Sequence, residues 1–357
     1  MTDSSRKVAP IRIGIVGCGA IAANHMRALR HIKAVKVVAL CDRNSDVANA
    51  LAAKHGIPSV HEDALTMLLE ERLQSLHVTT PPRTHAPICE LALQSGCHVL
   101  VEKPIALALS DLDAMLDMAR ANGLALSAVH NGLYQRAFHR ALVAVQAGAI
   151  GQLRSVHITD HIPSNCDIAA NAAHWCHGLS GGIYGEMLPH DIYLADALVP
   201  GLRLNDVRAY GSGRHSWLPV EQVFTSLSSG SSMVTLHVGV DGACWNKTIE
   251  ITGTTGTIRV DRMCDIVTNI TATSDWTLRT HCHRVASHVA AWMQQSAETA
   301  AARLSRHPQT GHDTLIWNFY SAMERGEAPP VSVEALRRTT KLYEELTAAI
   351  DSNISVS

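Results

Sequence analysis

Two side chains that can handle a proton lie four residues apart in the segment GEMLPHD, residues 185 to 191. On a helix, Glu186 and His190 would face the same direction. Imidazole has the ordinary pKa best suited to proton transfer near neutral pH, and a neighbouring carboxylate can orient the ring and favour its charged form. We therefore expect His190 to give or take a proton and Glu186 to orient it. The alternative is that His190 caps a helix and Glu186 is solvated.

Pro189 bears on the geometry of this pair. A proline well inside a helix clashes with the carbonyl group four residues earlier, which here belongs to Gly185. Either the helix begins near Pro189, or Gly185 absorbs a local widening. Both arrangements can leave Glu186 and His190 on the same side.

A second candidate site is the glycine-rich segment IRIGIVGCGAIA, residues 11–22. Its first six residues predict a buried parallel strand. Gly17 permits a tight turn, Gly19 lets the backbone approach a pyrophosphate, and Ala22 lets the following helix pack on the strand. Asp42 ends the next predicted strand. Its separation from Ala22 along the sequence is the one expected for a ligand of the ribose hydroxyls. The pattern indicates a dinucleotide site, and the alternative is a structural turn that binds no phosphate.

The elements that must position these residues alternate between strands and helices. Strands are predicted within residues 73–80, 97–102 and 124–130, and helices within 84–96 and 110–123. This alternation predicts a doubly wound parallel sheet. After about residue 151, strand-like segments follow one another closely, separated by turns; they cover residues 154–161, 204–213, 221–229, 231–240 and 246–253.

Composition narrows the class of protein. The 357 residues suggest two domains, and a formal net charge of −2 indicates neither a nucleic-acid partner nor an anionic membrane. The N-terminus lacks an apolar targeting segment, and no segment is apolar for the length of a membrane span. The nine cysteines are not spaced like a disulfide framework, so we expect them to be reduced thiols. We expect a cytoplasmic protein.

Three segments together resemble the glucose–fructose oxidoreductase and inositol dehydrogenase family (Gfo/Idh/MocA). They are GCGAIA, TTPPRTHAPICELALQSGCHVLVEKPIA and GGIYGEMLPHDIYLADAL. The resemblance continues through EITGTTGTIRVD and the closing PPVSVEALRRTTKLYEEL. It implies an α/β protein with a Rossmann domain at residues 1–125. A domain with an open, mostly antiparallel sheet would follow at residues 126–357, for substrate binding and oligomerisation.

The resemblance also implies cofactor and catalytic residues. Thr80, Pro81 and His85 would line the cofactor cleft, and Glu102 and Lys103 would lie by the nicotinamide. The complete expected cofactor set is Gly17, Gly19, Ala20, Ile21, Asp42, Arg43, Thr80, Pro81, His85, Glu102 and Lys103. NAD is the expected cofactor because Asp42 should repel a 2′-phosphate, whereas Arg43 beside it makes NADP possible.

The chain departs from the family pattern near the expected catalytic histidine. The family's Asp-x-x-x-His element falls on Glu186 and His190, so a longer acid replaces the aspartate. Tyr193 stands where the family has a further aspartate. Leu133 precedes Tyr134 where the family often has an arginine before an aromatic residue. These departures bear on the substrate more than on the hydride chemistry.

Hydride transfer is the chemistry of the nicotinamide, so the protein must move a proton on the substrate. Lys103 in a cleft could have a lowered pKa and could stabilise a developing alkoxide, whereas His190 has the better ordinary pKa. We expect both, with Glu186, to be catalytic. The substrate-contacting residues that we expect are Asn131, Tyr134, His174, Trp175 and His190.

Two further polar clusters contain residue types that can bind a metal ion. One comprises Cys166, His174, Cys176 and His177, and the other is HCH at 281–283. Neither has the Cys-x-x-Cys spacing typical of zinc, so we expect no metal. Arg136 could contact the substrate or pair with a carboxylate elsewhere in the chain.

The favoured function is an NAD(P)-dependent oxidoreductase acting on a secondary alcohol or ketone of a sugar, polyol or related small molecule. Alternatives are reduction of a C=N or C=C bond and a non-catalytic dinucleotide sensor. Because an open sheet exposes a face and edges, we also expect a homodimer or homotetramer.

Overall fold

The computed structural model describes residues 9–271, 277–304 and 310–354. The chain divides into two compact units. The first comprises Met1–His130 and His312–Arg337, and the second comprises Asn131–Gly311 and Arg338–Ser357. The predicted domains, 1–125 and 126–357, place residues 312–337 in the second domain, whereas the structure groups this segment with the first unit. The reason is burial, because Tyr320 of this segment hydrogen-bonds His77 inside the first unit.

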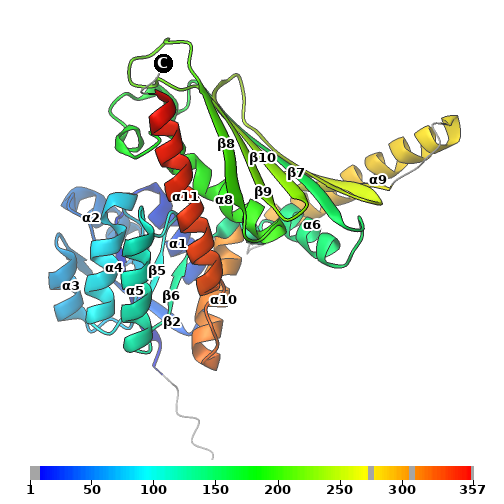
Figure 1. Cartoon of the computed structure of the whole chain (residues 1–357). Coiled ribbons are helices and arrows are strands. Elements are labelled where there is room, and N and C mark those ends of the chain that lie inside the picture. Colours follow the sequence, from blue (N-terminus) through cyan, green and yellow to red (C-terminus); the bar gives the residue numbers. More distant parts are fainter. Residues whose placement is uncertain (1–8, 272–276, 305–309, 355–357) are drawn as a thin grey trace, which may run out of the picture. The chain divides into compact units, whose positions relative to one another are not determined.

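The first unit is built on a six-stranded parallel sheet with the order β3-β2-β1-β4-β5-β6, coloured blue to cyan in Figure 1. Its strands are β1 (Ile11–Val16), β2 (Val35–Cys41), β3 (Ser59–His61), β4 (Ser75–Val78), β5 (His98–Val101) and β6 (Leu126–Ala128). Its helices are α1 (Ala20–Leu29), α2 (Ser45–His55), α3 (Ala64–Glu71), α4 (His85–Gln94), α5 (Leu109–Ala121) and most of α10 (Gly311–Arg325), with the short η1 (Pro82–Thr84). The predicted doubly wound sheet is confirmed.

Strand β4 shows how helices on the two faces of this sheet are held. Leu76 and Val78 lie in an apolar core with residues of α4 and α5, such as Leu93 and Leu112. Side chains alternate along a strand, so His77 between them points to the opposite face. On that face His77 forms hydrogen bonds with α1 and α10, so polar groups as well as apolar ones pack against the sheet.

The second unit is built on a seven-stranded sheet with the order β13-β12-β11-β7-β10-β9-β8. Its strands are β7 (Leu153–Pro163), β8 (Arg203–Tyr210), β9 (Gln222–Ser229), β10 (Ser232–Gly242), β11 (Asn246–Gly253), β12 (Gly256–Asp261) and β13 (Ile266–Thr271). Neighbouring strands are antiparallel except for the parallel pair of β7 and β10. The predicted open, mostly antiparallel sheet is therefore confirmed.

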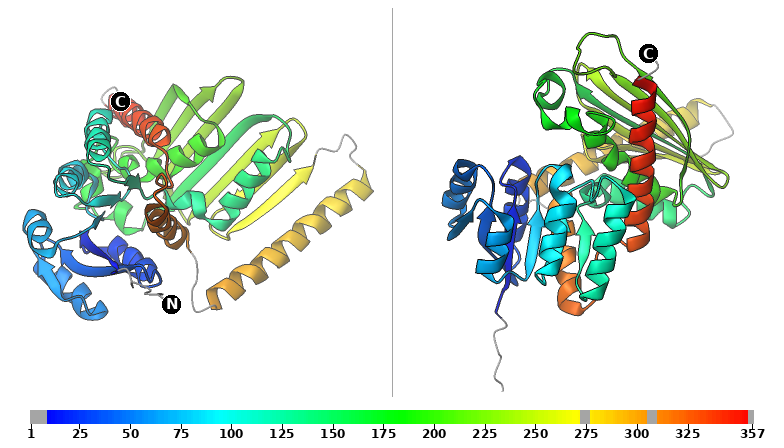
Figure 2. Two further views of the ribbon diagram at one scale, coloured as in Figure 1. Left: turned by 90° about the horizontal axis from the view of Figure 1, so that it is seen from below. Right: turned by 60° about the vertical axis from the view of Figure 1, so that its left-hand side comes forward.

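Helices border this sheet. They are α6 (Arg136–Gln146), α7 (Asp167–Ala170), α8 (Tyr184–Leu198), α9 (Leu278–Leu304) and most of α11 (Val333–Ile354), with the short η2 (Asn131–Tyr134) and η3 (Trp175–Gly178). Helix α8 contacts β7 and β10, and the long helix α9 runs beside β13 (Figures 1 and 2). Because α8 packs on the central strands, it is buried along most of its length.

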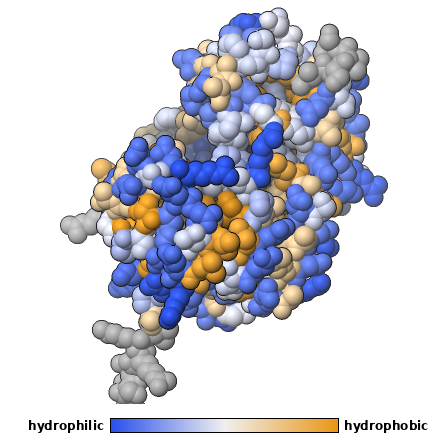
Figure 3. Space-filling view, turned by 90° about the vertical axis from the view of Figure 1, so that its left-hand side faces the viewer, coloured by the Kyte–Doolittle hydropathy of each residue, from blue (hydrophilic) through white to orange (hydrophobic). Residues whose placement is uncertain are grey.

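Hydrophilic and hydrophobic residues are mixed on the face that the space-filling view shows (Figure 3). In the first unit, Leu65 and Leu69 of α3 are among the exposed apolar side chains. None of the helices in the described part of the chain combines the length and the apolar character needed to cross a membrane.

Candidate active site

The glycine turn after β1 has the geometry that the sequence predicts. Gly17 has φ of 89°, and a Cβ atom there would lie 2.7 Å from the carbonyl carbon of Thr79, so only glycine fits. Gly19 precedes α1, and a Cβ atom added there would meet nothing within 4 Å. The turn therefore leaves space before the first residues of α1, Ala20 and Ile21, at the helix end that favours anions.

Asp42 follows β2 and ties the glycine turn to that strand. One carboxylate oxygen accepts a hydrogen bond from the Cys18 amide at 2.7 Å, and the other accepts one from the Asn44 amide at 2.9 Å. The carboxylate is thus fixed beside the turn, and Arg43 next to it is exposed. Thr79, which the sequence analysis did not single out, donates from its hydroxyl to the carbonyl of Gly17 at 2.6 Å.

His85 links the two loops that follow β4 and β5. Its Nδ1 lies 2.7 Å from the carbonyl oxygen of Pro104, and its Nε2 lies 2.8 Å from that of Thr80. Burial lowers the pKa of His85, whereas the two carbonyl acceptors favour the charged ring. Because carbonyl oxygens only accept, the imidazolium is the form that donates to both loops.

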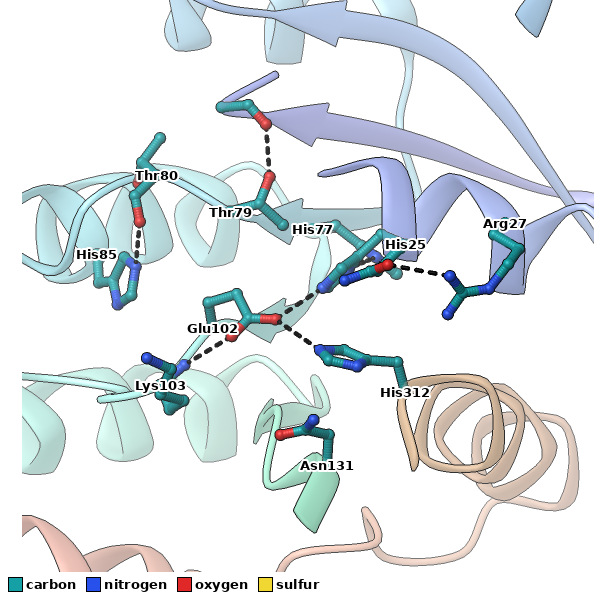
Figure 4. Close-up of polar contacts among 12 residues, drawn as sticks. His25, Arg27, His77, Thr79, Thr80, His85, Glu102, Lys103, Asn131 and His312 are labelled. Carbon is teal, nitrogen blue, oxygen red and sulfur yellow. Dashed lines mark hydrogen bonds and ion pairs between the residues drawn. The ribbon is translucent and has the colours of Figure 1, made fainter. Parts of the chain in front are cut away.

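Glu102 and Lys103 follow β5. Figure 4 shows the Glu102 carboxylate between His25, His312 and Lys103. Glu102 is 6% exposed; its Oε1 lies 3.0 Å from Nε2 of His25 and 3.6 Å from Nε2 of His312. Burial acts to raise the pKa of Glu102, but these two histidines hold it well below its ordinary value. The Lys103 amide donates to Glu102 Oε2 at 3.3 Å. The carboxylate is therefore anchored by histidines that the sequence analysis did not single out.

Helix α8 contains Pro189 in its interior, so the alternative in which the helix begins near Pro189 is wrong. A Cβ atom on Gly185 would lie 2.7 Å from the carbonyl oxygen of Ser180, which explains the need for glycine there. From residue 184 to 196, Glu186 and His190 are the two half-buried positions and the others are buried. The expectation that both face the same side of the helix is confirmed.

The His190 ring hydrogen-bonds Tyr193. Nδ1 of His190 lies 2.8 Å from Oη of Tyr193, and the tyrosine hydroxyl donates to Oδ1 of Asn131 at 3.2 Å. The hydroxyl oxygen of Tyr193 also accepts a hydrogen bond from the Gly132 amide at 2.9 Å. With its own proton directed to Asn131, Tyr193 accepts the proton of Nδ1, which leaves Nε2 as the basic nitrogen of the neutral ring.

Tyr193 is the residue that sequence reasoning noted as a departure without assigning it a role. Its spacing of three residues from His190 on a helix was the available signal. Glu186 acts on another pair of groups: burial raises the pKa of Cys176 to about 12, with a further contribution from the Glu186 charge. Burial and the same charge also raise the pKa of Tyr343. The orienting role of Glu186 stays a prediction.

The other expected substrate residues lie on short helical turns of the second unit. Asn131 and Tyr134 belong to η2, whereas His174 and Trp175 lie at the start of η3. Nδ1 of His174 is 3.0 Å from the sulfur of Cys176, and Trp175 is 40% exposed. Their contact with a substrate stays a prediction.

Arg136 pairs with Asp265 at 3.2 Å, which confirms the alternative in which it contacts a carboxylate elsewhere in the chain. Within the described ranges there is no group of three or more potential metal ligands. The expectation of no metal remains untested.

Similar sequences include known dehydrogenases. D-apiose dehydrogenase of Paraburkholderia graminis is 35% identical over 38% of this chain and 36% of its own length. Myo-inositol 2-dehydrogenase of Thermotoga maritima is 27% identical over 57% of this chain and 58% of its own length. The matched region thus spans roughly a third to somewhat over half of these relatives.

Solved structures extend the likeness to the whole fold. The WlbA dehydrogenase of Bordetella pertussis, crystallised with NADH and UDP-GlcNAcA, has a TM-score of 0.78. The likeness covers 96% of each chain at 21% sequence identity, so it shows a shared fold.

Two family models match successive parts of the sequence. The model described as "Oxidoreductase family, NAD-binding Rossmann fold" matches residues 11–130. The model described as "GFO/IDH/MocA C-terminal domain" matches residues 138–259. Together they cover more than half of the chain in the order that the two sheets follow, and the chain belongs to the Gfo/Idh/MocA family of oxidoreductases with an NAD-binding Rossmann domain.

Proposed function

We propose that the protein is an NAD(P)-dependent oxidoreductase that transfers a hydride between nicotinamide and a secondary alcohol or ketone. The observation that carries this proposal is His190, whose Nδ1 is held by Tyr193 at 2.8 Å so that Nε2 is the basic nitrogen. A histidine fixed in this way suits the proton transfer that accompanies hydride transfer. Membership of an NAD-binding oxidoreductase family supports the redox half of the proposal.

The proposed substrate is a sugar, a polyol or a related small molecule. The relatives described above are named as dehydrogenases of D-apiose and myo-inositol, both of which carry secondary alcohols. Tyr134, His174 and Trp175 are the proposed binding residues, because an exposed indole can pack on a sugar-like ring. The relatives' names do not favour reduction of a C=N or C=C bond or a non-catalytic sensor.

When bound, the nicotinamide supplies the hydride donor or acceptor. We assign the proton on the substrate oxygen to His190, with Lys103 as the charge that stabilises a developing alkoxide. Tyr193 and Asn131 keep the His190 ring in one tautomer. Glu186 is proposed to favour the charged ring through its carboxylate.

The test begins with a screen of NAD(P)H formation and consumption against polyols, sugars, ketones, imines and enones. With a substrate found, His190→Ala should lower kcat by about 10²–10⁴-fold, which is the general acid–base contribution. Tyr193→Phe should lower kcat less and shift the kinetic pKa of His190, because the ring loses its oriented partner. Tyr184→Phe is the matched control: it removes another buried hydroxyl from α8 and should leave kcat unchanged. Activity on imines or enones alone would contradict the alcohol assignment.

Glu186→Gln separates the two proposed partners of His190. If the carboxylate favours the imidazolium, this change should lower the kinetic pKa of His190, and it should be strongly non-additive with His190→Ala. An unmoved pKa would assign the orientation to Tyr193 alone. Lys103→Met should lower turnover at least ~10²-fold and keep dinucleotide binding, and retained turnover would remove Lys103 from the mechanism.

NAD is the proposed cofactor, because the fixed Asp42 carboxylate should repel a 2′-phosphate. Titration of both dinucleotides against tryptophan fluorescence tests this, and tighter binding of NADPH would overturn it.

A homodimer or homotetramer is also proposed. Two exposed rings on neighbouring strands of the open sheet, Tyr210 and Phe224, lie 5.9 Å apart between centroids, and Phe224 stacks on the half-buried His237 at 4.0 Å. Such a row suits burial against a second copy. Light scattering that gives a monomer at micromolar concentration would contradict it. The expected cytoplasmic location stays a prediction.

A further inference from the structure

A continuous chain of hydrogen bonds lies inside the first unit, beginning at Glu102. The carboxylate contacts Nε2 of His25 at 3.0 Å, and Nδ1 of His25 lies 2.7 Å from Nδ1 of His77. Nε2 of His77 lies 2.7 Å from the hydroxyl of Tyr320, which in turn lies 3.0 Å from the hydroxyl of Ser75. We call these five residues the histidine chain. Its members at the Glu102 end are drawn in Figure 4.

The histidine chain is shielded from water and assembled from separate elements. His25 comes from α1, Ser75 and His77 from β4, and Tyr320 from α10, and these four are at most 1% exposed. The rings of His77 and Tyr320 are stacked, with centroids 5.8 Å apart. Each ring nitrogen and each hydroxyl in the chain therefore has a partner within it, and the geometry of those partners is fixed by the fold.

The chain has two complete hydrogen-bond patterns, which differ by one proton. In the first, His25 donates from Nε2 to Glu102, His77 donates from Nδ1 to His25, and Tyr320 donates to Nε2 of His77. If His25 gains a proton on Nδ1, His77 must accept there and donate from Nε2 to Tyr320. The tyrosine then donates to Ser75. One added proton thus reverses the direction of every hydrogen bond beyond His25 and breaks none. It changes the net charge of the histidine chain from −1 to zero.

The position of Glu102 connects this charge to a bound dinucleotide. In a doubly wound sheet the ligand lies across the carboxyl ends of the strands, and the acid after the second strand marks the adenosine ribose. That acid is Asp42 after β2, so the nicotinamide half of a bound dinucleotide would lie toward the ends of β4 and β5. Glu102 directly follows β5. Oxidised nicotinamide carries a positive ring and reduced nicotinamide does not.

Other titratable groups face Glu102 and must be separated from the chain. His312 of α10 lies 3.6 Å from its carboxylate, and the charge of Glu102 also acts on His130 and His85. Burial lowers the pKa of His130 to about 3, so that ring stays neutral near neutral pH. The charge of Lys103, which is adjacent in sequence, also acts on His85. The experiments must therefore distinguish a proton on the histidine chain from a proton on His312.

We propose that the histidine chain stores one proton. Its charge would then change with the redox state of the bound dinucleotide. Building on the function proposed above, the chain carries its negative charge when oxidised dinucleotide is bound. It can hold the extra proton when the reduced form is bound. His25, His77 and Tyr320 are then positioning residues, because they act on the cofactor through Glu102.

The test is the pH dependence of the ratio of the NAD⁺ and NADH dissociation constants, measured by titration calorimetry. Burial lowers the pKa of His25 from 6.5, so at about pH 8 the chain is unprotonated with either dinucleotide. Below that pKa, NAD⁺ must expel the stored proton and NADH need not. The ratio should therefore rise as pH falls, by up to about tenfold per pH unit. A ratio that stays constant from about pH 8 to pH 5.5 would overturn the proposal.

Two variants assign the effect to the chain and not to His312. His77→Phe leaves the Nδ1 proton of a charged His25 without an acceptor, so the rise in the ratio should move to lower pH or vanish. Tyr320→Phe should act in the same direction, since it removes the hydroxyl that accepts from His77 in the protonated pattern. Tyr343→Phe is the matched control; within the described part of the chain its buried hydroxyl has no hydrogen-bond partner. A pH dependence that survives in His77→Phe would assign the proton to another group.

Histidine NMR on the dinucleotide-free protein gives a readout that needs no ligand. At about pH 8, His25 should be the Nε2–H tautomer and His77 the Nδ1–H tautomer. The same tautomer on both rings would sink the first pattern. Failure of both dinucleotides to bind would instead refute the proposed function, whereas binding with a constant ratio would refute the proton store alone.

Discussion

The two units bury ionisable groups in opposite ways. The first unit holds the histidine chain, which contains one carboxylate and two imidazoles whose pKa values are lowered by burial. The second unit holds an aspartate cluster of Asp160, Asp191, Lys247 and Arg262. Lys247 lies 2.6 Å from Asp160, and Nη1 of Arg262 lies 3.5 Å from Asp160 and 3.3 Å from Asp191.

The hydrogen bonding of the two groups differs as much as their charge. The histidine chain is fully bonded in either protonation state, whereas Oδ2 of Asp191 and Nε of Arg262 have no hydrogen-bond partner among the described residues. Removing one partner of the aspartate cluster leaves an uncompensated buried charge. Neutral imidazoles allow a proton to move at little cost. We infer that the aspartate cluster maintains the fold and that the histidine chain serves function.

Removal of a fixed cation should have the largest effect. Arg262→Met would leave Asp160 and Asp191 facing each other in a buried site, and it should lower the free energy of unfolding by about 3–5 kcal/mol. Arg259→Met is the matched control on β12, where the exposed arginine pairs with Glu250 and contributes about 0–1 kcal/mol. Denaturant unfolding of both variants measures the contrast. Equal losses would mean that the cluster is no more structural than a surface ion pair.

The pH dependence of stability provides the next test. Burial and the neighbouring Asp160 raise the pKa of Asp191 from 3.8 to about 7. The folded protein therefore binds this proton more tightly than the unfolded chain, so the contribution of Asp191 becomes less favourable as pH rises from about 4 to about 7. Asp191→Asn should match the wild type near pH 4 and be more stable than it near pH 8. A stability difference that does not change with pH would contradict this assignment.

Glu102→Gln tests the histidine chain with a smaller expected loss. The amide oxygen can still accept from His25, so the fold should lose about 1–2 kcal/mol, the difference between a charge-assisted and a neutral hydrogen bond. The affinity for NAD⁺ should fall more than that for NADH. Unfolding and titration calorimetry on one preparation measure both, and a loss as large as that of Arg262→Met would make the chain structural.

Tyr343→Phe should have the smallest effect. The tyrosine is 2% exposed, and its hydroxyl has no hydrogen-bond partner among residues 9–271, 277–304 and 310–354, which is unfavourable for a buried polar group. Its removal should change the free energy of unfolding by less than about 0.5 kcal/mol, or stabilise slightly. A clear loss would reveal a partner for this hydroxyl.

Features that depend on residues close together along the sequence could be predicted. Gly17 and Asp42 belong to a pattern whose spacing follows from one turn and two adjacent strands, and their geometry is as expected. Most strands of both sheets were predicted because apolar residues recur with a recognisable period. Three were not predicted, namely β3, β12 and β13, and the three-residue strand β3 is too short to carry such a period.

The histidine chain could not be predicted in the same way. His25, His77, Glu102 and Tyr320 are separated by tens to hundreds of residues and share no spacing rule. Tyr193 was visible as a departure from the family pattern, but its bond to His190 depends on where η2 places Asn131 and Gly132. Both cases rest on contacts between elements, which a single sequence does not encode locally.

Residues 312–337 come late in the sequence but belong to the first unit, and this has a consequence for biosynthesis. Ribosomes add about 5–20 residues per second, so roughly 10–40 seconds separate the emergence of Glu102 from that of Tyr320. During that interval the nascent Rossmann sheet lacks α10, and the imidazole of His77 has no tyrosine to contact. The imidazole pair therefore stays hydrated until nearly the whole polypeptide has been translated. The nucleotide-binding half, although it emerges early, is completed among the last parts of the molecule.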